Sequence, residues 1–145
     1  MRRPRRSDGG SALVEVVWLG VLLLVPVLWI VLSVFEVQRG AFAVTGAARS
    51  AARAYALADS DVAGIERARS AIRQSLVDQG GPDQQFRFDI SCDATPCHTP
   101  GAVITVQVWS RVRLPLLPAV LGGGAPSFRL DSTHTVPIGQ FRDFS

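Results

Sequence analysis

The sequence lacks the motifs on which most enzymes depend. It has no Walker-type phosphate-binding loop, no glycine-rich dinucleotide fingerprint, no G-x-S-x-G context and no cluster of metal-ligating residues. Histidine is scarce too, with only His98 and His134. Catalysis needs a nucleophile, a base and a stabilising group that converge in one site. We therefore predict that the protein is not an enzyme and that it has no catalytic residues and no cofactor.

Lysine is also absent, so all 15 basic residues among the 145 are arginines, against 12 acidic residues. This length allows one modest domain and excludes a multidomain enzyme. Residues 1–10 hold four arginines and one aspartate, a net charge of +3, whereas the other 135 residues hold 11 arginines and 11 acids, a net charge of zero. The basic balance therefore belongs to the first ten residues and gives no support to nucleic-acid binding.

Ionisable side chains are missing from Val16 to Phe35, a run of twenty residues. As a helix with a rise of about 1.5 Å per residue, this run is about 30 Å long, which matches the hydrocarbon core of a bilayer. We predict a transmembrane helix, because a buried helix of a soluble core seldom runs this long without a polar face. The arginine-rich start indicates a cytoplasmic N-terminus. Gly20 and Pro26 mark a kink or a contact with another helix.

A single carboxylate, Glu15, directly precedes this apolar run. The string from Gly10 through Ser11 to Glu15 (G-SALVE) resembles the processing site of type IV pilin-like proteins. In that class a prepilin peptidase cuts after the glycine that ends a basic leader, and a glutamate stands fifth in the mature chain. Glu36, Arg39 and the run Ala47-Ala48-Arg49 further resemble the TadE-like proteins of tight-adherence (Flp) pili. The resemblance covers residues 1 to about 58.

The resemblance implies cleavage between Gly10 and Ser11 and a role as a minor pilin or pseudopilin in pilus assembly or export. The implied partners are a prepilin peptidase, other pilin subunits, membrane lipid and, indirectly, inner-membrane platform proteins and a secretion ATPase. Before assembly the subunit would be a single-pass protein of the cell membrane with its C-terminal domain extracytoplasmic, and after assembly it would lie in the pilus or at the cell surface. Because an unpaired buried charge is unfavourable, we predict that Glu15 pairs with the Ser11 amine of a neighbouring subunit.

Two alternatives stay open. The triplet Ala41-Phe42-Ala43 has the form of a signal-peptidase site, and a cut there would release a secreted soluble domain that begins at Val44. The apolar run, however, is longer than the ~7–15 residues of the apolar region of a signal peptide. The chain could also stay uncut, as a single-pass membrane protein with an external binding domain. The first residue of the mature protein distinguishes the three.

Two helices are expected outside the apolar run. The alanine-rich stretch from Glu36 to Ala58 continues the membrane helix outward, and its charged side chains form a solvated face or hold anionic lipid or an acidic patch of a partner. These side chains are Glu36, Arg39, Arg49 and Arg53. Asp59-Ser60-Asp61 supplies cap residues for a second helix from Val62 to Gln79, which Gly80-Gly81-Pro82 ends. Its packing stripe is Ile65, Ala68, Ile72 and Leu76.

Three later runs alternate apolar and polar residues and predict strands at Phe86–Ile90, Ala102–Leu114 and Phe128–Val136. The expected fold is therefore α+β, with a long N-terminal helix, a second short helix and a small antiparallel sheet of about three strands. We divide the chain into a basic leader (1–10), a transmembrane and extended helix (11–58) and an extracytoplasmic α+β domain (59–145). So small a domain buries a thin core, so a disulfide or neighbouring subunits would help to stabilise it.

Cys92 and Cys97 enclose a short loop between the first two predicted strands. In a segment outside the cytoplasm two cysteines more often form a disulfide than a redox centre. The adjacent His98 permits a metal site of the form C-x4-C-H, but a fourth ligand and the usual spacing of structural zinc are missing. We predict a disulfide, worth about 2–3 kcal/mol at most for so short a loop, and no metal site.

Overall fold

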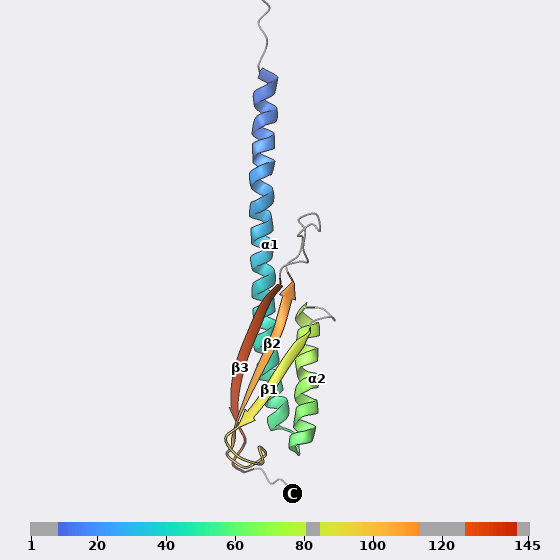
Figure 1. The fold of residues 1–145 in the computed structure, drawn as a ribbon, viewed down its shortest axis with the longest axis vertical. Helices are drawn as coiled ribbons and strands as arrows, with labels where there is room; N and C mark the ends of the chain where they lie inside the picture. The colour runs from blue at the N-terminus through green and yellow to red at the C-terminus, as the bar shows by residue number, and fades with distance from the viewer. Residues whose placement is uncertain (1–8, 81–84, 114–126, 142–145) are drawn as a thin grey trace, which may run out of the picture.

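The computed structural model describes residues 9–80, 85–113 and 127–141. It contains two helices and three strands, in an elongated arrangement in which one helix extends far beyond the rest (Figure 1). The predicted α+β fold is confirmed. The elements are α1 (Gly9–Ala56), α2 (Asp61–Gly80), β1 (Phe86–Cys92), β2 (Val103–Arg113) and β3 (Ser127–Pro137).

Helix α1 has 48 residues and passes through Pro26 without interruption. Its N-terminal half projects free of the other elements, whereas its C-terminal half lies behind the sheet and beside α2 (Figure 1). Every residue from Ala12 to Leu28 is exposed, and the first buried residue of the helix is Gly40. One helix is thus both the apolar projection and a central element of the folded part, which bears out the predicted outward continuation.

The buried face of the C-terminal half of α1 consists mainly of alanines. Because their side chains are small, the backbones of α2 and the sheet can approach the helix closely. The fully buried alanines of this face are Ala43, Ala47, Ala48, Ala51 and Ala52. The alanine-rich composition therefore serves packing in the core, on the side of the helix away from the exposed Arg49 and Arg53.

Helix α2 begins one residue earlier than predicted, and Ser60 caps it by accepting a hydrogen bond from the Ala63 N–H at 3.3 Å. Of its predicted packing stripe, Ala68, Ile72 and Leu76 are buried as expected, but the prediction for Ile65 is wrong, since this side chain is 40% exposed. Gly64 takes the buried place instead, because the ring of Tyr55 on α1 lies directly over it.

The three strands form one antiparallel sheet in the order β1-β2-β3. Alternate residues of β2, among them Ile104, Val106 and Val108, are fully buried against the helices, as the alternating pattern predicts. Each strand lies within two residues of its predicted bounds, and β1 reaches Cys92 because that residue pairs with Ile104. The predicted strand end Leu114, the loop 117–126 and the helix stop at 81–82 lie outside the described residues.

Candidate functional site

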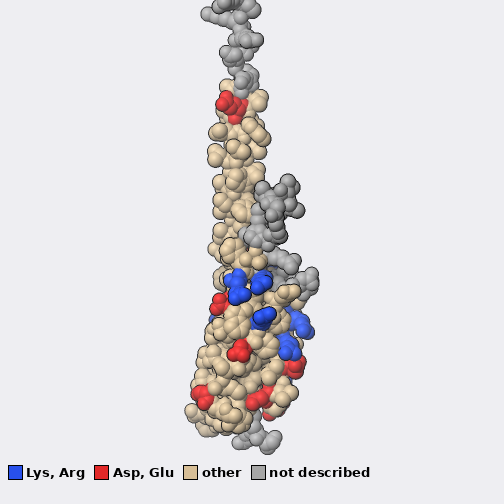
Figure 2. All heavy atoms as spheres, viewed as in Figure 1, with Lys and Arg blue, Asp and Glu red and all other residues tan. Residues whose placement is uncertain are grey.

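The exposed half of α1 is a candidate membrane span by length and composition. The most apolar 18-residue window of this helix has a mean hydropathy of 2.7, and none of it is buried in the protein. In Figure 2 the projecting rod is uncharged apart from one acidic residue near its tip. A surface this apolar is stable only when lipid or other apolar helices cover it.

The predicted processing and assembly residues lie at the start of this helix. Gly10 and Ser11 are in the first turn of α1, which begins at Gly9, so the helix starts before the predicted cut. Glu15 follows one turn later and is exposed. Within the described part of the chain no cation forms an ion pair with its carboxylate. A cation for Glu15 would therefore have to come from residues 1–8 or from another molecule.

The predicted cysteine pair lies near the opposite end of the molecule. Cys92 ends β1, and its Cα atom is 5.6 Å from that of Cys97, to which it is joined by a disulfide. Asp93 closes the same loop onto β2, since its carboxylate accepts a hydrogen bond from the Val103 N–H at 2.7 Å. Because both cysteines are joined in the disulfide, neither offers a thiolate to the alternative C-x4-C-H metal site. His98 contacts Asp61 on α2 and Tyr55 on α1 instead.

A polar junction that the sequence did not reveal joins the disulfide loop to both helices. The carboxylate of Asp61, the first residue of α2, accepts hydrogen bonds from the Tyr55 hydroxyl at 3.1 Å, from the Cys97 N–H at 3.4 Å and from Nδ1 of His98. Nε2 of His98 in turn donates to the Tyr55 carbonyl at 3.0 Å. The rings of Tyr55 and His98 also contact each other, with centroids 4.8 Å apart. Sequence reasoning missed this cluster because its members are up to 43 positions apart.

The electrostatics of this junction indicate a structural role. Both ring nitrogens of the buried His98 face oxygen atoms, the carboxylate of Asp61 and the carbonyl of Tyr55. The hydrogen bond from His98 lowers the pKa of Asp61, and burial followed by the charge of Asp61 raises the pKa of Tyr55 to about 12. Both ring nitrogens of His98 are thus engaged with other groups of the protein, which fits a structural role.

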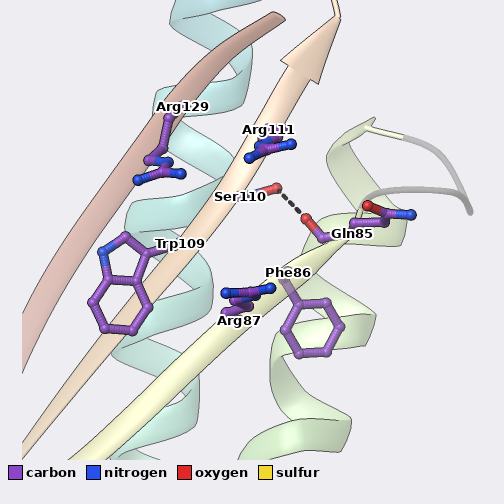
Figure 3. Close-up of a pocket in the computed structure, with 7 residues that line it drawn as sticks. All are labelled: Gln85, Phe86, Arg87, Trp109, Ser110, Arg111 and Arg129. Carbon is purple, nitrogen blue, oxygen red and sulfur yellow. Dashed lines mark hydrogen bonds between the residues drawn. The ribbon is translucent and has the colours of Figure 1, made fainter.

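A second polar feature lies where β1 begins, and its residues Arg87, Trp109, Arg111 and Arg129 are on the sheet face that is turned away from α1, whereas Phe86 and Ser110 are on the face toward the helices. There Gln85, Phe86, Arg87, Trp109, Ser110, Arg111 and Arg129 surround an open hollow of about 700 Å³ (Figure 3). The Ser110 hydroxyl donates a hydrogen bond to the Gln85 carbonyl at 3.4 Å. Three arginines around one tryptophan make this hollow basic and partly apolar, which suits an anionic group.

These features do not form a single site. Gly10, Ser11 and Glu15 lie on the free end of α1, whereas the cysteine pair lies beyond the far end of the sheet (Figure 1). Among the described residues, no three His, Cys, Asp or Glu side chains are placed to hold a metal ion.

No protein-family model, no curated protein and no solved structure matches the chain. The assignment of a function therefore depends on the residues and the geometry alone.

Proposed function

We propose that the protein is a pilin-like subunit of the TadE-like type, made with a short leader, cut between Gly10 and Ser11, and incorporated as a minor pilin or pseudopilin into a pilus or related secretion system. Its partners in this proposal are a prepilin peptidase, other pilin subunits and, indirectly, inner-membrane platform proteins and a secretion ATPase. Before assembly α1 spans the cell membrane with the N-terminus in the cytoplasm and the α+β part outside.

The observation that carries the proposal is the division of α1 into two halves. The first half is apolar and exposed, and the second half is the central helix of the folded part. A subunit built this way can rest in a membrane and later exchange lipid for the apolar helices of other subunits, because both surroundings cover the same surface. The glycine-serine bond and the glutamate precede this surface at the spacing that the resemblance requires.

The alternative cut after Ala43 fits the fold poorly. Ala43 and Val44 are both buried in the middle of α1, with exposed fractions of 0% and 1%. A cut between them would remove Ala43 and Gly40 from the core and would place a new charged amine there. The structure of the folded part therefore favours a chain that keeps its apolar helix.

The role of Glu15 is tested by the substitution Glu15→Ala, with Glu36→Ala as the matched control. Both remove one carboxylate from α1, at opposite ends of the apolar run. We expect the Glu15→Ala subunit to be cut and inserted normally but to be absent from assembled fibres, because the Ser11 amine of a neighbour then has no partner. The Glu36→Ala subunit should assemble. Mass spectrometry of the mature N-terminus and immunodetection in sheared fibres are the measurements.

Each outcome decides between the candidates. A mature chain that begins at Ser11 supports the proposal, whereas one that keeps Met1 or Arg2 supports the uncut single-pass protein with an external binding domain. Normal incorporation of Glu15→Ala into fibres contradicts the pairing of Glu15 with the amine of a neighbour.

A further inference from the structure

The outer face of the sheet separates its charges along the long axis of the molecule. Its arginines lie toward the C-terminal end of β2, where Arg111 is paired with Arg129 across the strands and Arg87 is paired with Trp109. Acidic residues of the same face begin at Asp131, opposite Trp109, and continue away from that end at Asp89. The C-terminal end of β2 points toward the free half of α1 (Figure 1). The basic end of this face is thus the end nearest the candidate membrane span.

The pairing of Arg111 with Arg129 opposes folding, because like charges directly opposite each other destabilise a sheet. Arg87, Arg111 and Arg129 are all exposed, and in the part of the chain that the structure describes none of them forms an ion pair. An anion held between the guanidinium groups would offset this repulsion, since arginine binds phosphate through two parallel N–H donors.

The distance from the apolar run identifies the anion. Arg39 follows Phe35 by four residues, or about 6 Å of helix, and the headgroup layer of a bilayer is about 5–8 Å thick on each side. Figure 2 shows basic side chains gathered where the apolar rod meets the folded part. If the run from Val16 to Phe35 fills the hydrocarbon core, the junction between the apolar rod and the folded part lies at the lipid phosphates, and the basic end of the sheet is the end of the sheet nearest to them (Figure 1).

We propose that Arg87, Arg111 and Arg129, together with Trp109, form a binding site for the phosphate headgroups of anionic phospholipids in the membrane that α1 spans. The arginines bind the phosphodiester oxygens, and Trp109, which precedes Arg111 by two residues on β2, borders the site on the side away from the membrane. This proposal rests on the membrane-anchored state of the proposed function, but it does not depend on cleavage after Gly10 or on assembly into a fibre.

Hydrogen exchange of the uncut full-length chain, with one copy per lipid nanodisc, tests the site. Discs of phosphatidylcholine are compared with discs that also contain phosphatidylglycerol, at low and at high salt. We expect amide exchange at 109–113 and 127–131 to slow by about fivefold per bound arginine in the anionic discs. The effect should weaken at high salt, because exposed charges are then screened.

Two charge-matched double variants separate the site from a general attraction to negative charge. Arg111→Gln with Arg129→Gln should abolish the difference between the two kinds of disc and should fold, because it relieves a repulsion. Arg49→Gln with Arg53→Gln should keep the difference. These two residues are exposed on α1 but follow Phe35 by 14 and 18 residues, or about 21 and 27 Å, well beyond the headgroups.

Equal exchange in both kinds of disc overturns the lipid site, as does a difference that survives Arg111→Gln with Arg129→Gln. Protection that appears only when a disc holds several copies points to a contact between subunits and also overturns it. Added glycerol phosphate that reproduces the protection in phosphatidylcholine discs would show a site for free phosphate instead. A chain that does not stay with the discs at all contradicts membrane anchoring itself, and that result is separate from all of these.

Discussion

The carboxylate of Asp61 links three parts of the folded region. It holds the Tyr55 hydroxyl at the end of α1, the Cys97 N–H in the disulfide loop and the ring of His98, while its own backbone begins α2. Since the buried face of α1 consists mainly of small alanines, we infer that this polar junction contributes substantially to holding α1 and α2 in place.

We expect Asp61→Asn to destabilise the folded part by about 1–2 kcal/mol, a figure reduced because the carboxylate side chain is 38% exposed. The amide carries no charge and has one oxygen in place of two, so it accepts fewer hydrogen bonds than the carboxylate does from Tyr55, Cys97 and His98. Thermal unfolding of the full-length chain in detergent, followed by circular dichroism, measures the change. Asp59→Asn is the control, because Asp59 forms only an exposed ion pair with Arg67 at 3.0 Å, and it should cost less than about 1 kcal/mol.

The same junction predicts how stability depends on pH. Because the pKa of Asp61 is lowered in the folded state, its contribution is complete above the ordinary value of 3.8 and is lost as the pH falls through the lowered pKa. Tyr55 has its pKa raised to about 12, so its contribution is complete below 10 and is lost as the pH rises from 10 to 12. The unfolding midpoint should therefore decline at both extremes.

Two variants test which residue causes the loss of stability at each extreme of pH. Asp61→Asn should flatten the acid limb of the profile of unfolding midpoint against pH, and Tyr55→Phe should flatten the alkaline limb. If the unfolding midpoint of both variants falls at acid and alkaline pH as it does in the unsubstituted protein, the assignment of the pH dependence to this pair is contradicted.

At the scale of the elements, the contact between α1 and α2 is closest at Gly64. A Cβ atom built there would lie 2.8 Å from Cδ2 of Tyr55 and 3.2 Å from Cε1 of His98. We expect Gly64→Ala to cost about 1–3 kcal/mol, since the Tyr55 ring is buried and must shift. Gly46→Ala, on α1, is the matched control, because the nearest atom is Nε2 of Gln79 at 3.9 Å.

The control should stabilise the protein by about 0.5–1 kcal/mol, as alanine does in a helix interior. Denaturant unfolding of the two variants side by side measures both changes. A Gly64→Ala protein as stable as the unsubstituted one would contradict the close contact between the helices.

The elements of this fold were predictable because each has a periodic local pattern. The uncharged run predicted the free half of α1, and alternation placed the three strands within two residues of their bounds. Ile65 was wrongly assigned to the core because its place depends on the Tyr55 ring, ten positions earlier on another helix. The sequence did not predict the junction around Asp61 or the pairing of Arg111 with Arg129 for the same reason. The first arises from tertiary contacts and the second from strand register.

At the scale of the whole molecule, α1 connects the exposed apolar rod to the folded α+β part, because it belongs to both. Residues Ala43 to Tyr55 supply one wall of the core, so the C-terminal half of α1 is part of the folded region. A fragment that begins after Phe35 keeps this wall, whereas one that begins at Val44 loses Gly40 and Ala43 from it.

The unbroken course of α1 also fixes the rotation of the sheet about the helix axis relative to Glu15. One alanine inserted between Val37 and Gln38 would turn the folded part by about 100° and lift it by about 1.5 Å. We expect this insertion to leave the unfolding midpoint nearly unchanged but to reduce incorporation into fibres, because Glu15 and the outer face of the sheet would then meet different neighbours. Simultaneous deletion of Val34 restores the angle and should restore incorporation. Helix α1 thus sets the angle at which the sheet is held relative to Glu15 and the apolar run.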